Sequence, residues 1–166
     1  MTSGPRPDLP LFEELFLRRA VELAHEGVAA GEGGPFGALV VRNGEVLAEG
    51  WNRVLTDNDP TAHAEVTAIR RACLAVGDFQ LPGAVVYSSC EPCPMCLGAL
   101  YWARPEAVYF AASRYDAAEA DFDDSFIYDE IPLPPQARSL TFRHVPIDGA
   151  TGPFAAWLAK SDRTPY

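Results

Sequence analysis

The chain has 166 residues, of which 48% are hydrophobic and 22% are charged, a composition typical of one ordinary globular domain. Its 13 lysines and arginines against 23 aspartates and glutamates give a formal net charge of −10. Proteins that bind nucleic acid need a basic surface, so this balance argues against a nucleic-acid partner. No run approaches the roughly 20 apolar residues of a membrane span, and residues 1–10 lack a secretory signal. We therefore expect a single cytoplasmic domain, 1–166, without membrane contact.

The first fifty residues predict a helix followed by a β-hairpin. Apolar residues recur at three- and four-residue intervals from Leu11 to about Val28, which predicts an amphipathic helix. The extended segments 36–41 and 45–49 flank Asn43-Gly44, the dipeptide that best suits a type I′ turn. These segments therefore predict two antiparallel strands.

The middle of the chain predicts a helix over 64–76 and then a βαβ unit. The two strands of this unit are expected over 84–88 and 107–111, and its helix over about 94–102. Strands joined in this way are parallel, with a right-handed crossover.

After residue 120 the pattern becomes weaker. Residues 121–130 are acidic and aromatic, 140–145 predict a last strand, and 154–160 predict a short helix. Together with the hairpin and the βαβ unit, these segments predict the α/β class. We expect a three-layer α/β/α sandwich around a mixed five-stranded sheet.

Three of the four cysteines lie close together, which is poor spacing for disulfides. Cys90, Cys93 and Cys96 fall within seven residues, while Cys73 stands alone. Cys93 and Cys96 share one face of a helical first turn, and His63 begins another predicted helix. Two thiolates and an imidazole suit Zn²⁺ and leave a fourth position for water, as in catalytic sites. Two alternatives are a redox-active C-x-x-C pair and a structural site with Cys90 as fourth ligand.

The His63-Ala64-Glu65 and Pro92-Cys93-x-x-Cys96 segments together form H-x-E…P-C-x-x-C, the signature of zinc-dependent deaminases. Zinc lowers the pKa of its bound water toward about 7, which supplies the nucleophile. Glu65 would carry a proton from this water to a substrate ring nitrogen, and later to the departing amine. Alternatively, Glu65 only stabilises the dipole of its helix.

Longer segments resemble bacterial guanine deaminases of the cytidine-deaminase-like fold. The resemblance runs from about residue 11 to the C-terminus. Its segments are P-F-G-A at 35–38, D-P-T-A-H-A-E-V-T-A-I-R at 59–70, S-C-E-P-C-P-M-C-L-G-A at 89–99, Y-W-A-R-P at 101–105, A-A-E-A-D-F-D-D-S-F-I-Y at 117–128 and the final Tyr166. The resemblance implies release of ammonia from guanine to give xanthine. It assigns His63, Cys93 and Cys96 to zinc and Glu65 to proton transfer.

The same resemblance implies the residues that bind the purine. Asn52 would hydrogen-bond the purine, and the backbone N–H of Ala64 would face a substrate carbonyl. Phe36 and Trp102 would border the ring. Tyr166 would close the site, in this family often from the partner subunit of a domain-swapped homodimer. The segment that swaps would be about 146–166.

Asp124 is assigned by the resemblance to the N–H edge of guanine. Guanine presents adjacent ring N–H and amino donors, and a carboxylate that only accepts hydrogen bonds matches them. Asp121 and Asp123 are rivals for this role, and an acidic solvated turn is the alternative for the whole segment. Trp51 departs from the family pattern, where a smaller or polar residue is expected, and this leaves fine specificity open.

Three other functions compete with guanine deamination. A more open site would accept guanosine or another aminated heterocycle, such as cytosine or a triazine. A tRNA adenosine deaminase shares the zinc motifs, but the acidic balance of the chain argues against it. In a non-catalytic scaffold, the zinc would only hold the fold.

Overall fold

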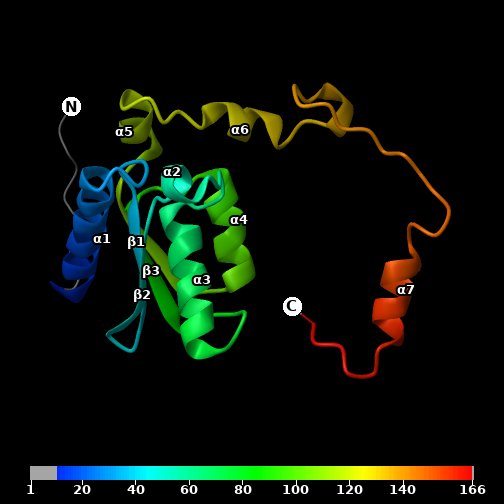
Figure 1. Ribbon diagram of the computed structural model, residues 1–166, viewed down its shortest axis with the longest axis horizontal. Helices are drawn as coiled ribbons and strands as arrows, with labels where there is room; N and C mark the ends of the chain where they lie inside the picture. Colours follow the sequence, from blue (N-terminus) through cyan, green and yellow to red (C-terminus); the bar gives the residue numbers. More distant parts are fainter. Residues whose placement is uncertain (1–10, 166) are drawn as a thin grey trace. The chain divides into compact units, whose positions relative to one another are not determined.

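The structure is a computed structural model that describes residues 11–165, with side chains from residue 13 onward (Figure 1). Its internal contacts divide the chain into two units, Met1–Asp124 and Ser125–Tyr166. The first unit contains the sheet and all the predicted metal ligands.

In residues 11–124, the part of the first unit that the structure describes, the sheet has four strands in the order β2-β1-β3-β4. β1 (Gly37–Arg42) is antiparallel to both β2 (Glu45–Trp51) and β3 (Ala84–Cys90). β3 is parallel to β4 (Ala107–Ala112). The predicted hairpin and the predicted βαβ unit are therefore both confirmed.

The prediction of a fifth strand is wrong for the part of the chain that the structure describes. Residues 140–145 form no strand in the second unit, and the sheet has four strands. The expectation depended on β-propensity alone, and a strand needs a neighbouring strand to satisfy its backbone groups.

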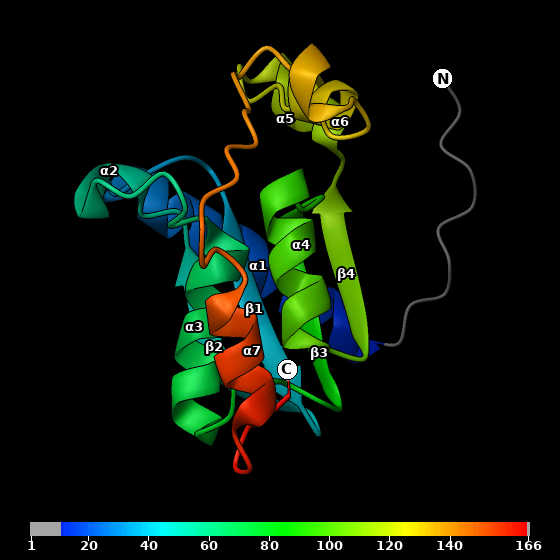
Figure 2. The ribbon, with the colours of Figure 1, turned by 90° about the vertical axis from the view of Figure 1, so that its right-hand side faces the viewer.

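Helices cover both faces of the sheet, as Figures 1 and 2 show. α1 (Leu11–Ala29) packs on one face, where Leu23 meets Leu39 and Tyr87 in one buried cluster. α3 (Ala64–Val76) and α4 (Pro94–Ala103) cover the other face, and their core includes Val40 and Val86. Leu39 and Val40 point to opposite faces because side chains alternate along a strand. The predicted three layers and mixed sheet are thus present.

Glycine brings the end of β2 close to the start of α3. A Cβ at Gly50 would lie 2.4 Å from the carbonyl oxygen of Ala64 and 2.5 Å from the amide nitrogen of Ala68. Only a residue without a side chain allows this approach. As a result, the residues that follow β2 lie beside the first turn of α3.

Two short helices complete the described part of the first unit. α2 (Val54–Asp57) follows β2, and α5 (Arg114–Glu119) follows β4. The Ser113 side chain accepts from the amide of Asp116, whose carboxylate in turn accepts from Ser113, so a capping box fixes the start of α5. The residues after α5 lead to Asp124, the last residue of the first unit.

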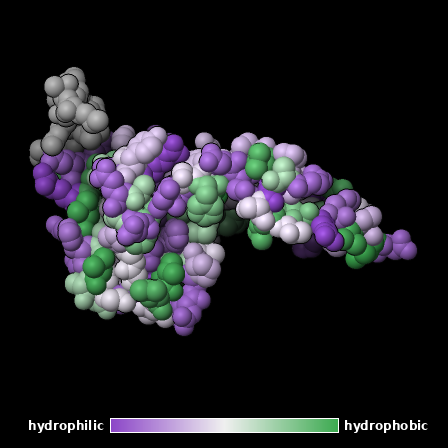
Figure 3. Space-filling model, turned by 90° about the horizontal axis from the view of Figure 1, so that it is seen from above, coloured by the Kyte–Doolittle hydropathy of each residue, from purple (hydrophilic) through white to green (hydrophobic). Residues whose placement is uncertain are grey.

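The described residues of the second unit, 125–165, form three short helices and expose apolar side chains. α6 (Ser125–Glu130), a 3-10 helix (Pro135–Ala137) and α7 (Gly152–Ala159) contain no buried residue. Figure 3 shows hydrophobic atoms in green among hydrophilic ones on the surface. No helix in the described part of the chain has both the length and the apolarity to cross a membrane.

Candidate metal centre

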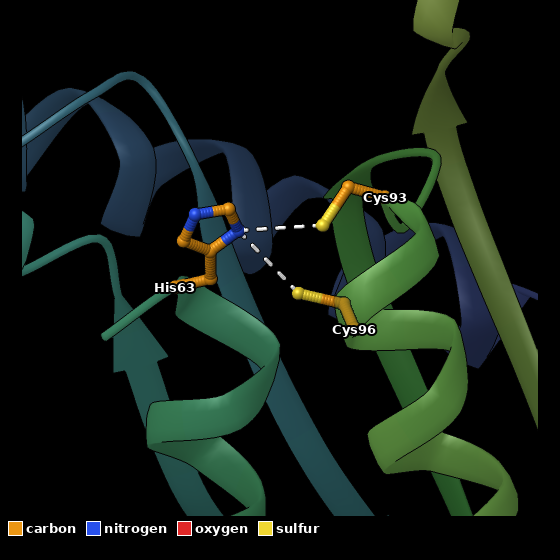
Figure 4. Close-up of side chains that lie close together, drawn as sticks. All are labelled: His63, Cys93 and Cys96. Carbon is orange, nitrogen blue, oxygen red and sulfur yellow. Dashed lines mark hydrogen bonds between the residues drawn. The ribbon is translucent and has the colours of Figure 1, made fainter. Parts of the chain in front are cut away.

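The three predicted metal ligands lie together where α3 and α4 begin. His63 directly precedes α3, Cys93 directly precedes α4, and Cys96 is buried in the first turn of α4. The His63 Nδ1 atom lies 3.5 Å from the Sγ atoms of both cysteines, and all three side chains point toward one another (Figure 4). Neither His63 nor Cys93 caps its own helix with its side chain. Both side chains therefore remain available to a metal ion.

The spacing of these donors fits zinc. Bonds of about 2.3 Å to sulfur and about 2.0 Å to nitrogen at a tetrahedral angle separate the two donors by about 3.5 Å. The observed Nδ1–Sγ distances of 3.5 Å agree with that value. The three ligand atoms also lie within 4.8 Å of one another.

The charge distribution also favours a cation at this point. Hydrogen bonds from Cys96 and His63 lower the pKa of the Cys93 thiol to about 4. Cys93 in turn raises the pKa of His63 by hydrogen bonding. The pKa of Cys96 is raised because it shares its proton with Cys93 and is buried. The lowered pKa of Cys93 favours its thiolate form, and a divalent ion would stabilise a thiolate at both cysteines.

Cys90 lies outside this group, although it is near in sequence. Among the described residues, the metal-binding group comprises His63, Cys93 and Cys96. Burial raises the pKa of Cys90 to about 11, and its Sγ lies 3.4 Å from the carbonyl oxygen of Ser113. Cys90 is therefore a protonated thiol that connects β3 to the start of α5. All four cysteines are free, as the sequence predicts.

Glu65 lies in the first turn of α3 and is 6% exposed. The Ser88 hydroxyl on β3 donates to its Oε1 atom at 3.1 Å. Burial raises the pKa of Glu65, so this carboxyl group holds a proton more readily than an exposed glutamate. Ser88 is not among the site residues predicted from the sequence, although a hydroxyl at a buried position of an apolar strand is a signal for such a role.

Asn52 is buried where β2 ends. Its Oδ1 atom accepts hydrogen bonds from the amides of Gly34 and Val54, at 3.1 and 3.2 Å. Two backbone donors require the oxygen at this position, so the orientation of the side-chain amide is fixed. Its Nδ2 group has no hydrogen-bond partner within residues 11–165 and is available as a donor.

Phe36 lies next to Asn52, because the backbone carbonyl oxygen of Phe36 accepts a hydrogen bond from the backbone N–H of Asn52 at 3.0 Å. Its ring packs edge to face on Phe122, with the ring centres 5.0 Å apart. Phe122 thereby connects the segment after α5 to the neighbourhood of Asn52. Phe122 is not among the site residues predicted from the sequence, although it lies within the acidic and aromatic segment 121–130.

Residues 11–112 match a known protein family, the cytidine and deoxycytidylate deaminase zinc-binding region. The chain belongs to this family. It is 58% identical to guanine deaminase of Bacillus subtilis over 153 residues, which are 92% of this chain and 98% of that protein. The crystal structure of guanine deaminase from Bacillus subtilis superposes with a TM-score of 0.90 at the same identity and coverage.

Two further deaminases are similar over different shares of the chain. The tRNA-specific adenosine deaminase of Bacillus subtilis is 42% identical over 100 residues, which are 60% of this chain and 62% of that protein. The structure of guanine deaminase from Nitrosomonas europaea is 28% identical, covers 82% of both chains and has a TM-score of 0.64. The zinc-binding family and the His63, Cys93 and Cys96 group identify Zn²⁺ as the cofactor of this deaminase-family chain.

The remaining predicted substrate-binding residues of this deaminase-family chain lie in different places. Ala64 is the first residue of α3, where a backbone N–H has no acceptor within the helix. Asp124 is half-buried, and its pKa is raised by burial and by the negative charge of Cys93. Trp102 is 64% exposed in the last turn of α4, about 12 Å along the helix from its first residue. Tyr166 lies outside the described residues.

Proposed function

We propose that this chain is a zinc-dependent deaminase that converts guanine to xanthine and ammonia. The observation that carries the proposal is its similarity to guanine deaminase of Bacillus subtilis over 98% of that protein. By comparison, its similarity to the tRNA-specific adenosine deaminase of that organism covers 62% of the relative. The acidic net charge of −10 also favours a small uncharged substrate over an RNA.

His63, Cys93 and Cys96 would hold the zinc ion. When bound by them, zinc supplies a nucleophilic water at neutral pH. Because Ser88 donates to Oε1 of Glu65, we assign the mobile proton to Oε2. Glu65 accepts this proton from the attacking water and donates it to a ring nitrogen of the purine. Glu65 then transfers the second proton of the same water to the amino group of the substrate. In total, one C–O bond forms, one C–N bond breaks and ammonia leaves.

The polar groups that we propose for substrate binding suit the two edges of guanine. The Nδ2 group of Asn52 and the backbone N–H of Ala64 are donors for acceptor atoms of the purine. Asp124 would accept from the ring N–H and the amino group. Of the three neighbouring aspartates, Asp124 is half-buried, whereas Asp121 and Asp123 are exposed. The charge of Cys93 acts on Asp124, which supports its choice for this role.

The purine ring of the substrate would lie against Phe36. It would also contact Asn52, the neighbour of Phe36. For Trp102 and Tyr166, a role in substrate binding is implied by the family resemblance alone. The exposed position of Trp102 in the last turn of α4 means that its contribution needs a test of its own.

Ammonia release provides the test of the activity. Wild-type protein should release ammonia from guanine, with guanosine, cytosine, adenine and a triazine as the comparison panel. Glu65→Gln should bind zinc at the wild-type level and lose at least about a thousandfold in kcat, because glutamine cannot carry a proton. Turnover of another member of the panel without turnover of guanine would reject the substrate. Wild-type activity in Glu65→Gln would reject the mechanism.

We also propose a homodimer in which the C-terminal segment, about 146–166, lies on the partner subunit. The eight residues of α7 carry no charge, and Phe154 and Leu158 are 69% and 65% exposed. Apolar side chains exposed on one short helix favour contact with another protein surface. A second copy of the chain is the occupant that the family resemblance implies.

Subunit complementation tests the exchange of this segment. The double variant Phe154→Ser/Leu158→Ser should reduce dimerisation in analytical ultracentrifugation, whereas Leu74→Ser on α3, exposed to 83%, should not. Mixed and refolded with Glu65→Gln, the double variant should regain activity, because an intact segment then reaches an intact metal centre. Absence of any recovery would reject the exchange, and a monomeric wild type would reject the dimer.

We further propose a reducing, cytoplasmic location, since the metal centre needs two thiolates and all four cysteines are free.

A further inference from the structure

Glu32 connects both sequence neighbours of Asn52. Its Oε2 atom accepts a hydrogen bond from the indole Nε1–H of Trp51 and another, at 2.7 Å, from Arg53. Its backbone carbonyl accepts from the amide of Thr56 at 3.2 Å. Glu32 thus joins the loop before β1 to the chain that follows β2.

The partners of Glu32 are themselves held in place. The Arg53 guanidinium makes two further hydrogen bonds to Asp57, at 3.1 and 2.9 Å. Arg71 lies over the Trp51 ring at 4.6 Å from its centre and donates to the carbonyl oxygen of Glu49. The ring of Trp51 therefore has a cation on its face and an acceptor at its edge, and neither neighbour of Asn52 is free to rotate.

The loop that carries Glu32 also contacts Asn52 directly. A Cβ at Gly33 would lie 2.2 Å from Asn52 Oδ1, and the amide of Gly34 donates to the same atom. Displacement of this loop would remove one of the two donors that orient the Asn52 amide. Its Nδ2 group would then no longer have a fixed direction.

We propose that Glu32 is a positioning residue that acts through Asn52: by accepting from Trp51 and Arg53, it keeps the Asn52 amide oriented for the purine. This inference depends on the proposed function only for the identity of the substrate. It also gives Trp51 a role, since a smaller side chain at this position could not reach Glu32.

Kinetics on four proteins test the proposal. Glu32→Ala should raise the KM for guanine about tenfold, the equivalent of one well-placed hydrogen bond, with kcat within about threefold of wild type. Glu32→Gln, which keeps one acceptor oxygen, should lie between these values. Glu14→Ala removes an exposed ion pair with Arg18 on α1 and should match wild type. Zinc content should stay at one ion per chain in all of them.

A double-mutant cycle distinguishes positioning from a general effect on the fold. In the Asn52→Ala background, Glu32→Ala should not raise KM further, because the residue through which it acts is gone. Additive effects of the two substitutions would overturn the proposal, as would a wild-type KM in Glu32→Ala. Loss of zinc from Glu32→Ala would overturn it as well.

A readout that needs no substrate separates this inference from the proposed function. In ¹⁵N NMR spectra, the side-chain amide signals of Asn52 are identified by their loss in Asn52→Ala. They should shift or broaden in Glu32→Ala and not in Glu14→Ala, and unchanged signals in Glu32→Ala would overturn the proposal. If wild type released no ammonia from guanine, the proposed function would fail while this result would still decide the role of Glu32.

Discussion

Replacement of Gly50 by alanine should destabilise the fold at the junction between β2 and α3. The added methyl group would lie 2.4 Å from the Ala64 oxygen, 2.5 Å from the Ala68 nitrogen and 3.0 Å from the Ala68 Cα. All three atoms belong to the backbone, so no side-chain rotation relieves the contacts. Either β2 or the first turn of α3 must therefore move.

The magnitude follows from the overlap. Overpacking of a core by one methyl group costs about 1–3 kcal/mol, and contacts with backbone atoms belong at the upper end of that range. A loss of about 3 kcal/mol lowers the Tm of a domain of this size by roughly 6–12 °C. Since Ala64 follows the metal ligand His63, the same displacement should also lower zinc affinity.

Gly98 provides the matched control. It lies within α4, and a Cβ there would meet no atom within 4 Å. Gly98→Ala should leave the Tm unchanged or raise it by an amount equivalent to about 1 kcal/mol, because alanine favours the helix. Differential scanning calorimetry of the zinc-loaded proteins measures both. A Tm for Gly50→Ala within about 2 °C of wild type would refute the reasoning from the close approach.

Three further perturbations have expected outcomes. Removal of zinc by a chelator should lower Tm, by the equivalent of about 4 kcal/mol when zinc was present at a thousand times its Kd, and added zinc should restore it. The Arg19 guanidinium lowers the pKa of Glu49 below its usual value of 4.5, so this pair stabilises the fold above that pH and loses its effect as the pH falls through the lower folded value. Glu49→Gln should remove that part of the acid dependence in urea titrations, and an unchanged pH profile would contradict it. Ser113→Ala removes the cap of α5 and should reduce stability by about 1 kcal/mol, with faster amide hydrogen exchange confined to that helix.

The metal ligands were predictable because each depends on a local pattern. Cys93 and Cys96 are three residues apart at a helix start that Pro94 marks, and His63 stands at the start of another helix. The H-x-E…P-C-x-x-C motif predicted that His63 at one helix start and the two cysteines at the other bind the same ion. The spacing of these residues in the sequence does not give this by itself. The fold followed for the same reason, since the hairpin and the βαβ unit are formed by neighbours in sequence.

The errors and omissions arise where structure depends on distant residues. Residues 140–145 have the composition of a strand, but no sequence signal states whether a sheet edge is available to them. Ser88 and Glu65 are 23 residues apart in the sequence, and they meet because α3 packs on the face of the sheet that contains β3.

Glu32 shows most clearly what could not be predicted from the sequence. In the sequence it is one carboxylate in a glycine-rich loop, and a solvated charge is the ordinary interpretation of such a residue. The resemblance predicts that Trp51 departs from the family pattern, yet this prediction alone does not name the partner of its side chain. The partner lies 19 residues away and is reached because the chain reverses at the hairpin between β1 and β2. A residue that is predicted to depart from a family pattern, beside a proposed substrate-binding residue, is therefore best interpreted through the contacts of its side chain, and here these contacts lead to Glu32.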